Sequence, residues 1–397
     1  MPLFGPKYNP IVGLDIGTSA IRAMEVRPDG QRWRLHRWHQ APLPPQLLTD
    51  GKIKKSDEII KFIKDFFKEG KFSTNKVAIS IGGPSIISKK ILVEKMPEMD
   101  LEDQIALEAE EYIPFEIDDV FLDFQILGDM DDKMAVLLSA CKKDLVNDKL
   151  EICREAGIDP KVLDLDVLCL ANAFETFIAT PKKKGKKKTL PKEKTKGAKK
   201  GTKNASASKE ASPTKGIGSA ATAGEKAETI VAFANIGSQT LNTLILVGGI
   251  IDYSRDVSFG AKSMIAEIIE QTGLTMEEVQ SALQKPAHQS TTPQLGEAWE
   301  NTVKPFEEKL ASQIRQSIDF FQSSRPSKDK IQTILLSGGV AAIAGIEQRL
   351  GQDLGVPVEI FNPVLKLGND GKTPAPSAGQ APGFTVSLGL ALRGVSS

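Results

Sequence analysis

Two short glycine turns with the same pattern lie 220 residues apart, at positions 15 and 235. They read Asp15-Ile16-Gly17-Thr18-Ser19 and Asn235-Ile236-Gly237-Ser238-Gln239. Glycine lets the backbone approach a ligand closely, and successive backbone N–H groups in a tight turn form an anion-binding nest. The pair therefore predicts two loops that clamp phosphate groups from both sides, with the following residues in contact: Asp15, Gly17, Thr18, Ser19, Asn235, Gly237, Ser238, Gln239 and Thr240.

The residue two positions before each glycine makes the two turns unequal. An acid there can hold water on a hard cation such as Mg²⁺, so Asp15 is the predicted metal contact, through water. Asn235 offers hydrogen bonds but no charge, so it can still bind water or phosphate but cannot serve as a base or add a second negative charge to the metal shell. The alternative is that Asn235 only caps its turn through its side chain.

A third glycine turn follows a strand expected at Ile331–Leu336. Ser337-Gly338-Gly339 forms the turn, and a helix is expected over Val340–Leu354. This order leaves a flat surface at a helix N-terminus, against which a ligand can lie. An ordinary turn also uses glycine, so a structural role is the alternative.

The elements around the first two turns indicate an α/β fold with an internal duplication. Each turn joins two apolar, β-prone runs, Ile11–Ile16 with Ala20–Val26 and Ile230–Ile236 with Leu241–Val247. The repeated unit is far too long for a solenoid. It predicts two like domains that face each other.

A compact acidic unit, at about 85–140, interrupts the first half. It is expected as strand Ile86–Val93, helix Leu101–Tyr112, and strands Phe121–Leu127 and Met134–Ala140. Paired carboxylates suit acid–base chemistry. A solvated helix face with an acidic loop is the alternative.

Charge is balanced over the 397 residues, with 51 Lys plus Arg and 51 Asp plus Glu. That balance gives no support to a nucleic-acid binder driven by overall charge. Residues 182–215 hold 14 Lys and only two acids, Glu193 and Glu210, so the rest of the chain is acidic. We expect 181–226 to be a disordered linker. Its lysines are either a solvated tether or a contact for phosphate or anionic lipid.

The chain shows few signs of metal, disulfide or membrane chemistry. Three Cys and three His are too few and too irregularly spaced for a disulfide framework or a zinc site. Residues 1–8 do not resemble a signal peptide, and the longest apolar stretch, Leu244–Ile251, is far short of the ~20 residues that span a bilayer. We expect a reduced, cytoplasmic, soluble protein.

The order Asp-Ile-Gly-Thr, Asn-Ile-Gly-Ser, then Leu-Ser-Gly-Gly resembles the phosphate-1, phosphate-2 and adenosine motifs of the actin and sugar-kinase superfamily. A closer resemblance is to the PilM family of actin-like type IV pilus assembly proteins, related to the division protein FtsA. It covers nearly the whole chain outside 180–226. The segments that carry it are 113–117, 122–127, Glu155-Ala156-Gly157-Ile158, Phe320-Phe321 with Ser323-Ser324, 354–359 and 388–394.

The resemblance implies an actin-like ATPase fold, in which two duplicated domains, 1–180 and 227–397, face a nucleotide cleft. Subdomain 1C would be inserted in 1A at about 85–140, and subdomain 2B in 2A at about 262–330. Gln280 replaces the lysine of the family's nucleoside-contacting stretch. The nucleoside contacts implied are Gly260, Lys262, Glu277, Gln280, Gly338 and Gly339.

The family binds ATP with Mg²⁺ and grips the N-terminal cytoplasmic tail of the inner-membrane protein PilN, between 1A and 1C. The resemblance therefore implies an ATP-binding adaptor of pilus biogenesis and twitching motility, peripheral to the inner membrane, with at most weak ATPase activity. Self-association is a further option. We predict that about Ile86–Val93 forms one wall of the tail groove, with Ile91 as the contact to test, and we assign no catalytic residue.

Two alternatives stay open. A sugar-kinase-type phosphotransferase needs a base, for which Asp164 and Asp166 are the only suitably placed acids, and an N-cap role for Asp166 competes with that assignment. An FtsA-like division scaffold is expected to end in an amphipathic membrane helix, and no such pattern precedes Ser397.

Overall fold

The computed structural model describes residues 9–30, 32–49, 52–54, 56–130, 132–178, 229–285, 293–324, 330–369, 371 and 373–395. The linker predicted at 181–226 lies outside the described residues. The strands are β1 (Val12–Ile16), β2 (Ala20–Asp29), β3 (Arg32–Pro42), β4 (Leu48–Thr49), β5 (Lys52–Ile53), β6 (Lys76–Ile81), β7 (Ile86–Glu94), β8 (Val120–Met130), β9 (Lys133–Lys142), β10 (Asp159–Leu165), β11 (Ile230–Ile236), β12 (Leu241–Val247), β13 (Ile250–Val257), β14 (Thr333–Ser337), β15 (Val358–Ile360) and β16 (Gly368–Asn369). The α-helices are α1 (Asp57–Gly70), α2 (Glu98–Tyr112), α3 (Lys143–Glu155), α4 (Asp166–Ile178), α5 (Lys262–Thr272), α6 (Met276–Leu283), α7 (Pro293–Ala298), α8 (Lys304–Ser323), α9 (Ile346–Leu354) and α10 (Thr385–Ala391).

Two sheets of like topology confirm the predicted duplication. The first has the order β10-β6-β1-β2-β3-β16, and the second has the order β15-β14-β11-β12-β13 when read in the same direction. In each, a central strand pairs antiparallel with the strand after its glycine turn and parallel with a later strand. The registers match, because Asp15 faces Arg22 and Asn235 faces Asn242. The chain therefore has the actin-like fold, with two duplicated α/β domains.

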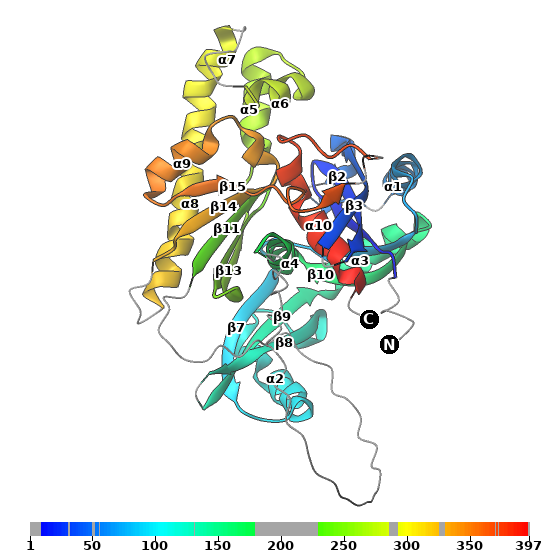
Figure 1. Ribbon diagram of the computed structural model, residues 1–397, viewed down its shortest axis with the longest axis vertical. Helices are drawn as coiled ribbons and strands as arrows, with labels where there is room; N and C mark the ends of the chain where they lie inside the picture. Colours follow the sequence, from blue (N-terminus) through cyan, green and yellow to red (C-terminus); the bar gives the residue numbers. More distant parts are fainter. Residues whose placement is uncertain are drawn as a thin grey trace, which may run out of the picture. The chain divides into compact units, whose positions relative to one another are not determined.

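The two domains share a buried core around α4 and α10, which lie between the sheets in Figure 1. Phe174 of α4 meets Phe233 of β11 edge to face, with ring centroids 5.2 Å apart. Met24 of β2 and Leu388 of α10 belong to the same cluster and are fully buried. This common apolar layer joins the two domains.

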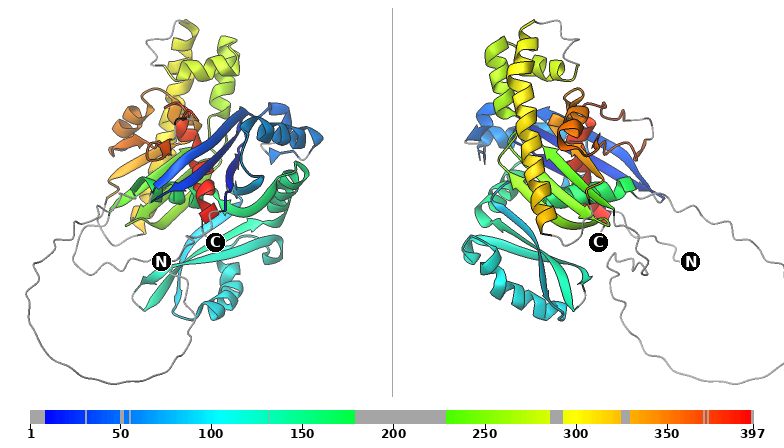
Figure 2. Two further views of the ribbon diagram at one scale, coloured as in Figure 1. Left: turned by 45° about the vertical axis from the view of Figure 1, so that its right-hand side comes forward. Right: turned by 90° about the vertical axis from the view of Figure 1, so that its left-hand side faces the viewer.

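A smaller sheet, of order β7-β9-β8, carries α2 on one face (Figure 2). Its core joins Leu101 and Ile105 of α2 to Ile91, Val136 and Leu138 of the sheet. Successive strand residues point to opposite faces, so Ser88, Lys90 and the other residues at even positions of β7 point away from α2. That second face of β7 is turned toward the rest of the chain.

The helix predicted over Val340–Leu354 is wrong in its first part. Gly339–Ala342 form a 3₁₀ turn, and α9 begins only at Ile346. Ile343 is extended and Gly345 has a φ of 71°, so the helical hydrogen-bond pattern cannot run through them. The glycine pair therefore lies in a turn and not directly at the start of an α-helix.

Candidate functional site between the two glycine turns

The two predicted phosphate turns have the same backbone geometry. The Gly17 N–H donates to the Ala20 carbonyl oxygen over 3.2 Å, and the Gly237 N–H donates to the Thr240 carbonyl oxygen over 2.9 Å. The turn residues between them, Thr18, Ser19, Ser238 and Gln239, are half-buried or exposed. Each turn thus presents short polar side chains and backbone to solvent, as an anion site requires.

A chain of side-chain hydrogen bonds runs from the second turn toward the first domain. The Ser337 hydroxyl donates to Asn235 Oδ1 over 3.0 Å, and Asn235 Nδ2 donates to Asn242 Oδ1 over 2.8 Å. Asn242 Nδ2 donates to Asp256 Oδ1 over 2.9 Å, and the Gly83 N–H donates to Asp256 Oδ2 over 2.8 Å. A carboxylate only accepts, so Asp256 sets the direction in which both amides point.

Three carboxylates from different elements gather near the bases of the turns. Burial, with the negative charge of Asp166 next, raises the pKa of Asp15 to about 6, against the opposing charges of Arg22 and Lys149. Burial also raises the pKa of Asp256 to about 6, against its bonds to Asn242 and Gly83, and Asp166 adds to the rise. Asp166, the first residue of α4, is thus the common neighbour of both acids.

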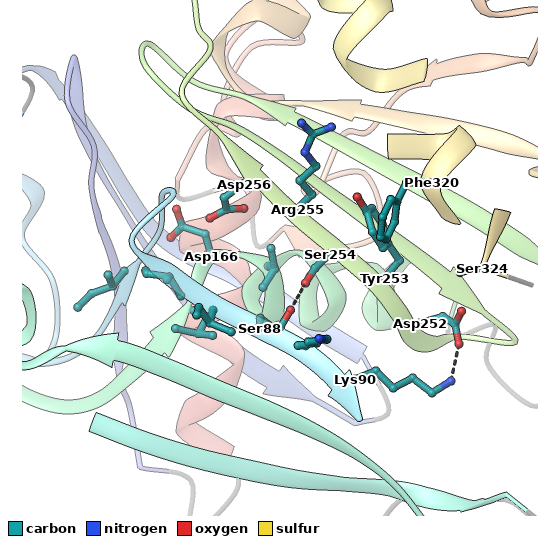
Figure 3. Close-up of a pocket in the computed structure, with 16 residues that line it drawn as sticks. Ser88, Lys90, Asp166, Asp252, Tyr253, Ser254, Arg255, Asp256, Phe320 and Ser324 are labelled. Carbon is teal, nitrogen blue, oxygen red and sulfur yellow. Dashed lines mark hydrogen bonds and ion pairs between the residues drawn. The ribbon is translucent and has the colours of Figure 1, made fainter. Parts of the chain in front are cut away.

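The backbone at Gly82 leaves room for the Asp166 carboxylate. A Cβ atom at Gly82 would lie 1.8 Å from Asp166 Oδ2, so a larger residue would displace the acid. Figure 3 shows the Asp166 and Asp256 carboxylates side by side at one end of a cavity of about 480 Å³. No residue predicted for phosphate or nucleoside binding lines this cavity, whereas residues 86–90 of the predicted tail-groove wall do. Besides the two acids, the residues that line the cavity are Ile81, Ile86, Ile87, Ser88, Lys89, Lys90, Leu165, Val167, Asp252, Tyr253, Ser254, Arg255, Phe320 and Ser324.

The Gly338-Gly339 turn is packed against both domains. Gly338 has a φ of 86°, and a Cβ atom there would lie 2.3 Å from the Ile236 carbonyl oxygen. Its N–H donates to the Pro382 carbonyl oxygen over 3.0 Å, while a Cβ atom at Gly339 would lie 4.0 Å from an Arg22 guanidinium nitrogen. Glycine at 338 is therefore required by the fold itself, beside any role in binding.

The other predicted nucleoside residues fall into two groups. Gly260 lies against the second turn, where a Cβ atom would be 2.4 Å from Ser238, and the Lys262 N–H donates to the Ser238 carbonyl oxygen over 2.8 Å. Glu277 and Gln280 are exposed on α6. The end of α6 is fixed beside the glycine pair's 3₁₀ turn, since the Ala344 N–H donates to the Leu283 carbonyl oxygen over 2.9 Å.

Asp164 and Ile91, which the sequence suggested as a possible base and a groove residue, both make contacts that stabilise the fold. Asp164 is 4% exposed and pairs with Arg393 over 2.9 Å, which occupies the carboxylate considered as a phosphotransfer base. Ile91 is 5% exposed and its side chain lies in the core of the small sheet, against α2.

Sequence reasoning missed Arg22, Gly83, Asn242 and Asp256. Arg22 and Asn242 could in principle have been found. Four residues separate the last paired residues of each hairpin, and this register places Arg22 opposite Asp15 and Asn242 opposite Asn235. Asp256 and Gly83 are separated by 173 positions. No local pattern marks their contact.

Comparison with known proteins agrees with this architecture. The family model described as type IV pilus assembly protein PilM matches residues 13–191 and 215–395. A solved PilM–PilN type IV pilus biogenesis complex is similar, with 24% identity, a TM-score of 0.74, and coverage of 98% of this chain and 100% of the other. The ethanolamine utilization protein EutJ from Carboxydothermus hydrogenoformans has 13% identity and a TM-score of 0.50, over 99% of this chain and 91% of its own.

Proposed function

Because the chain belongs to the PilM family of type IV pilus assembly proteins, we propose that it is an ATP-binding adaptor of pilus assembly that binds the N-terminal tail of PilN. The proposal of nucleotide binding rests on the pair of equivalent glycine turns, with the carboxylates of Asp15, Asp166 and Asp256 near their bases. The observation that carries the tail part is the fold shared with the PilM–PilN complex. Through PilN the adaptor would reach the inner membrane, and its loss is expected to abolish pili and twitching.

The residues present fit Mg·ATP. Asp166 lies close enough to Asp15 for its charge to add to the rise that burial causes in the pKa of Asp15, so a cation between the two carboxylates would relieve their repulsion. Within the described residues, no group of three His, Cys, Asp or Glu side chains is arranged to hold a metal directly. Asp15 and Asp166 would hold Mg²⁺ through water, and the bound ion would neutralise phosphate charge.

The second turn is suited to holding phosphate and not to proton transfer. Both polar atoms of the Asn235 side chain are engaged, one by Ser337 and one by Asn242. A neutral amide in this position cannot serve as a base. We therefore expect this site to hydrolyse ATP slowly at most.

Calorimetric titration with Mg·ATP tests the nucleotide proposal. Asp15→Ala should weaken binding about tenfold or more, because it removes the charge nearest the metal, whereas Asn235→Ala should weaken it less. Equal affinities of wild type and Asp15→Ala, at unchanged stability, would contradict the assignment. Single-turnover hydrolysis on the same proteins checks the second point, and brisk wild-type turnover lost only on Asn235→Ala would overturn it.

For the tail groove, we propose the place where the small sheet faces β10. Asp123 of β8 lies on the sheet face opposite α2. Burial raises the pKa of Asp164, which pairs with Arg393, and the charge of Asp123 adds a smaller part to that rise. Ile91 points the other way, so a charge there tests the small core and not the groove. Asp123→Lys is expected to weaken a PilN-tail peptide by about 1–3 kcal/mol. Asp129→Lys, at the far end of the same strand, is the control, and equal peptide affinity in both variants would remove β8 from the groove.

No helix formed by the described residues is long and apolar enough to cross a membrane.

A further inference from the structure

β7 and β13 are edge strands of two different sheets, and they run past each other beside the cavity of Figure 3. In the described pairings, each belongs to its own ladder and no main-chain ladder joins them. Side chains of β13 make the connection instead. The two sheets are therefore linked by a few discrete bonds, with open volume next to them.

Three alternate residues of β13 provide these bonds. Asp252 forms an ion pair with Lys90, and the Ser254 hydroxyl donates to the Ser88 carbonyl oxygen over 2.8 Å. Asp256 accepts from the Gly83 N–H over 2.8 Å. Because alternate strand residues share a face, one face of β13 holds residues 83–90 of the first domain along its length.

The inner end of this row is joined to the second glycine turn. Asp256 accepts from Asn242, and Asn242 accepts from Asn235, which lies two residues before Gly237. We infer that β13 is a coupling strand, through which a change at the second glycine turn is transmitted to the small sheet β7-β9-β8. The identity of the ligand that triggers it rests on the proposed function, whereas the coupling itself rests on these bonds.

The nature of the contact suits a reversible connection. A side-chain hydrogen bond contributes about 1 kcal/mol net, so the row can be broken or reset at a cost comparable to a modest ligand preference. The cavity of about 480 Å³ lies between the two strands, so their relative movement does not require repacking of a filled core. A continuous backbone ladder would be far stiffer.

Hydrogen exchange of the ligand-free protein tests the coupling directly. Asn235→Ala interrupts the side-chain hydrogen bonds that lead from the second turn to Asp256. It should raise amide exchange in β7 about five- to tenfold, which corresponds to the loss of one net hydrogen bond. Peptides of α1 should stay unchanged and exclude general unfolding. Asn235→Ser serves where the alanine variant does not fold. Exchange that rises only in β11 and β12, with β7 as in wild type, would overturn the inference.

Variants that remove two of the bonds between β13 and β7 test whether these bonds carry the effect. In Lys90→Met with Ser254→Ala, the change at Asn235 should add nothing further at β7. Lys89→Met is the control, because the Lys89 ammonium lies over the Tyr112 ring, 5.1 Å from its centroid, on the α2 side of the same strand. The bond from the Gly83 N–H to Asp256 remains in this variant but lies outside β7. A response of β7 that persists in the double variant would show that the bonds of Asp252 and Ser254 do not carry it, and would overturn the inference.

Saturating Mg·ATP separates the inference from the proposed function. In wild type and Lys89→Met it should protect both residues 237–240 and β7, and in the double variant only 237–240. If Mg·ATP protects neither in wild type, the nucleotide proposal fails and the ligand-free experiment still decides the coupling. Protection of 237–240 with β7 unchanged in wild type would refute the coupling.

Discussion

An aspartate at position 235 would give the second turn the acid that Asp15 provides in the first turn, and the structure predicts that this substitution destabilises the fold. Each amide of the chain Ser337–Asn235–Asn242–Asp256 donates on one side and accepts on the other. With carboxylates at both 235 and 256, the Asn242 carbonyl oxygen must face one of them. That contact is satisfied only when one carboxyl group is protonated.

The pKa of Asp256, raised to about 6 by burial, sets the expected cost. Holding a proton on this group at pH 7.5 takes about 1.5 pKa units, which is roughly 2 kcal/mol at ~1.4 kcal/mol per unit. Asn235→Asp should therefore lose about 2 kcal/mol of unfolding free energy relative to wild type at pH 7.5. The deficit should shrink toward pH 5.5, because the folded variant binds an extra proton and such a state loses stability as pH rises.

Urea unfolding followed by tryptophan fluorescence at the two pH values measures this deficit. The double variant Asn235→Asp with Asp256→Asn again has one acid, with the Asn242 side chain reversed, and should return to within ~0.5 kcal/mol of wild type. The control replaces Asp256→Asn with Asp252→Asn, because Asp252 also lies on β13 but takes no part in the hydrogen bonds between Asn235 and Asp256. Full stability of Asn235→Asp at pH 7.5, or no rescue in the double variant, would refute the reasoning.

Two further predictions concern stability and are measured by thermal or urea denaturation. Gly338→Ala should cost ~3 kcal/mol or more, because its Cβ atom would lie 2.3 Å from a carbonyl oxygen of β11. Gly355→Ala, with a φ of 67° and open space around it, should cost only about 1–2 kcal/mol, and equal losses would contradict the clash. Arg349→Met should cost ~3 kcal/mol, because it leaves the buried Glu307, now bonded over 2.6 and 2.7 Å, without its partner. Lys304→Met, which removes an exposed pair, should stay within ~0.5 kcal/mol, and a similar small effect at Arg349 would show that Glu307 finds water.

The duplication and both turns were predictable because their causes are local. A β-prone run, a glycine turn and a second β-prone run specify a hairpin wherever they occur, so Asp15 and Asn235 could be placed at equivalent strand ends from sequence alone. The order of the three glycine motifs then pointed to the actin-like fold. The interruption of the helix predicted from Val340 was harder to predict. It depends on the left-handed conformation of Gly345, and a glycine alone does not exclude a helix in the sequence pattern.

The two other acids of the site, Asp166 and Asp256, were not predictable in the same way. Asp256 reads as one polar residue in an alternating strand, and it acquires a role only because Gly83 lies against it in the folded chain. Asp166 looked like a helix-starting acid, and the structure adds two acidic neighbours from other elements. Ile91 looked like a residue near a subdomain boundary, but strand alternation turned it toward α2. Each outcome depends on tertiary contacts that no window of the sequence contains.

The hydrogen-bond chain gives a reason for an amide at position 235. A carboxylate there would serve only the second turn, whereas the carboxylate of Asp256 touches Asn242 on one side and the backbone of Gly83 in the other domain on the other side. The negative charge near the second turn is thereby placed where it binds the two domains together. Hydrolysis does not require that arrangement, but an adaptor does, because occupancy at one site must alter a distant surface. The position of this one acid therefore favours a conformational role over a chemical one for the proposed nucleotide.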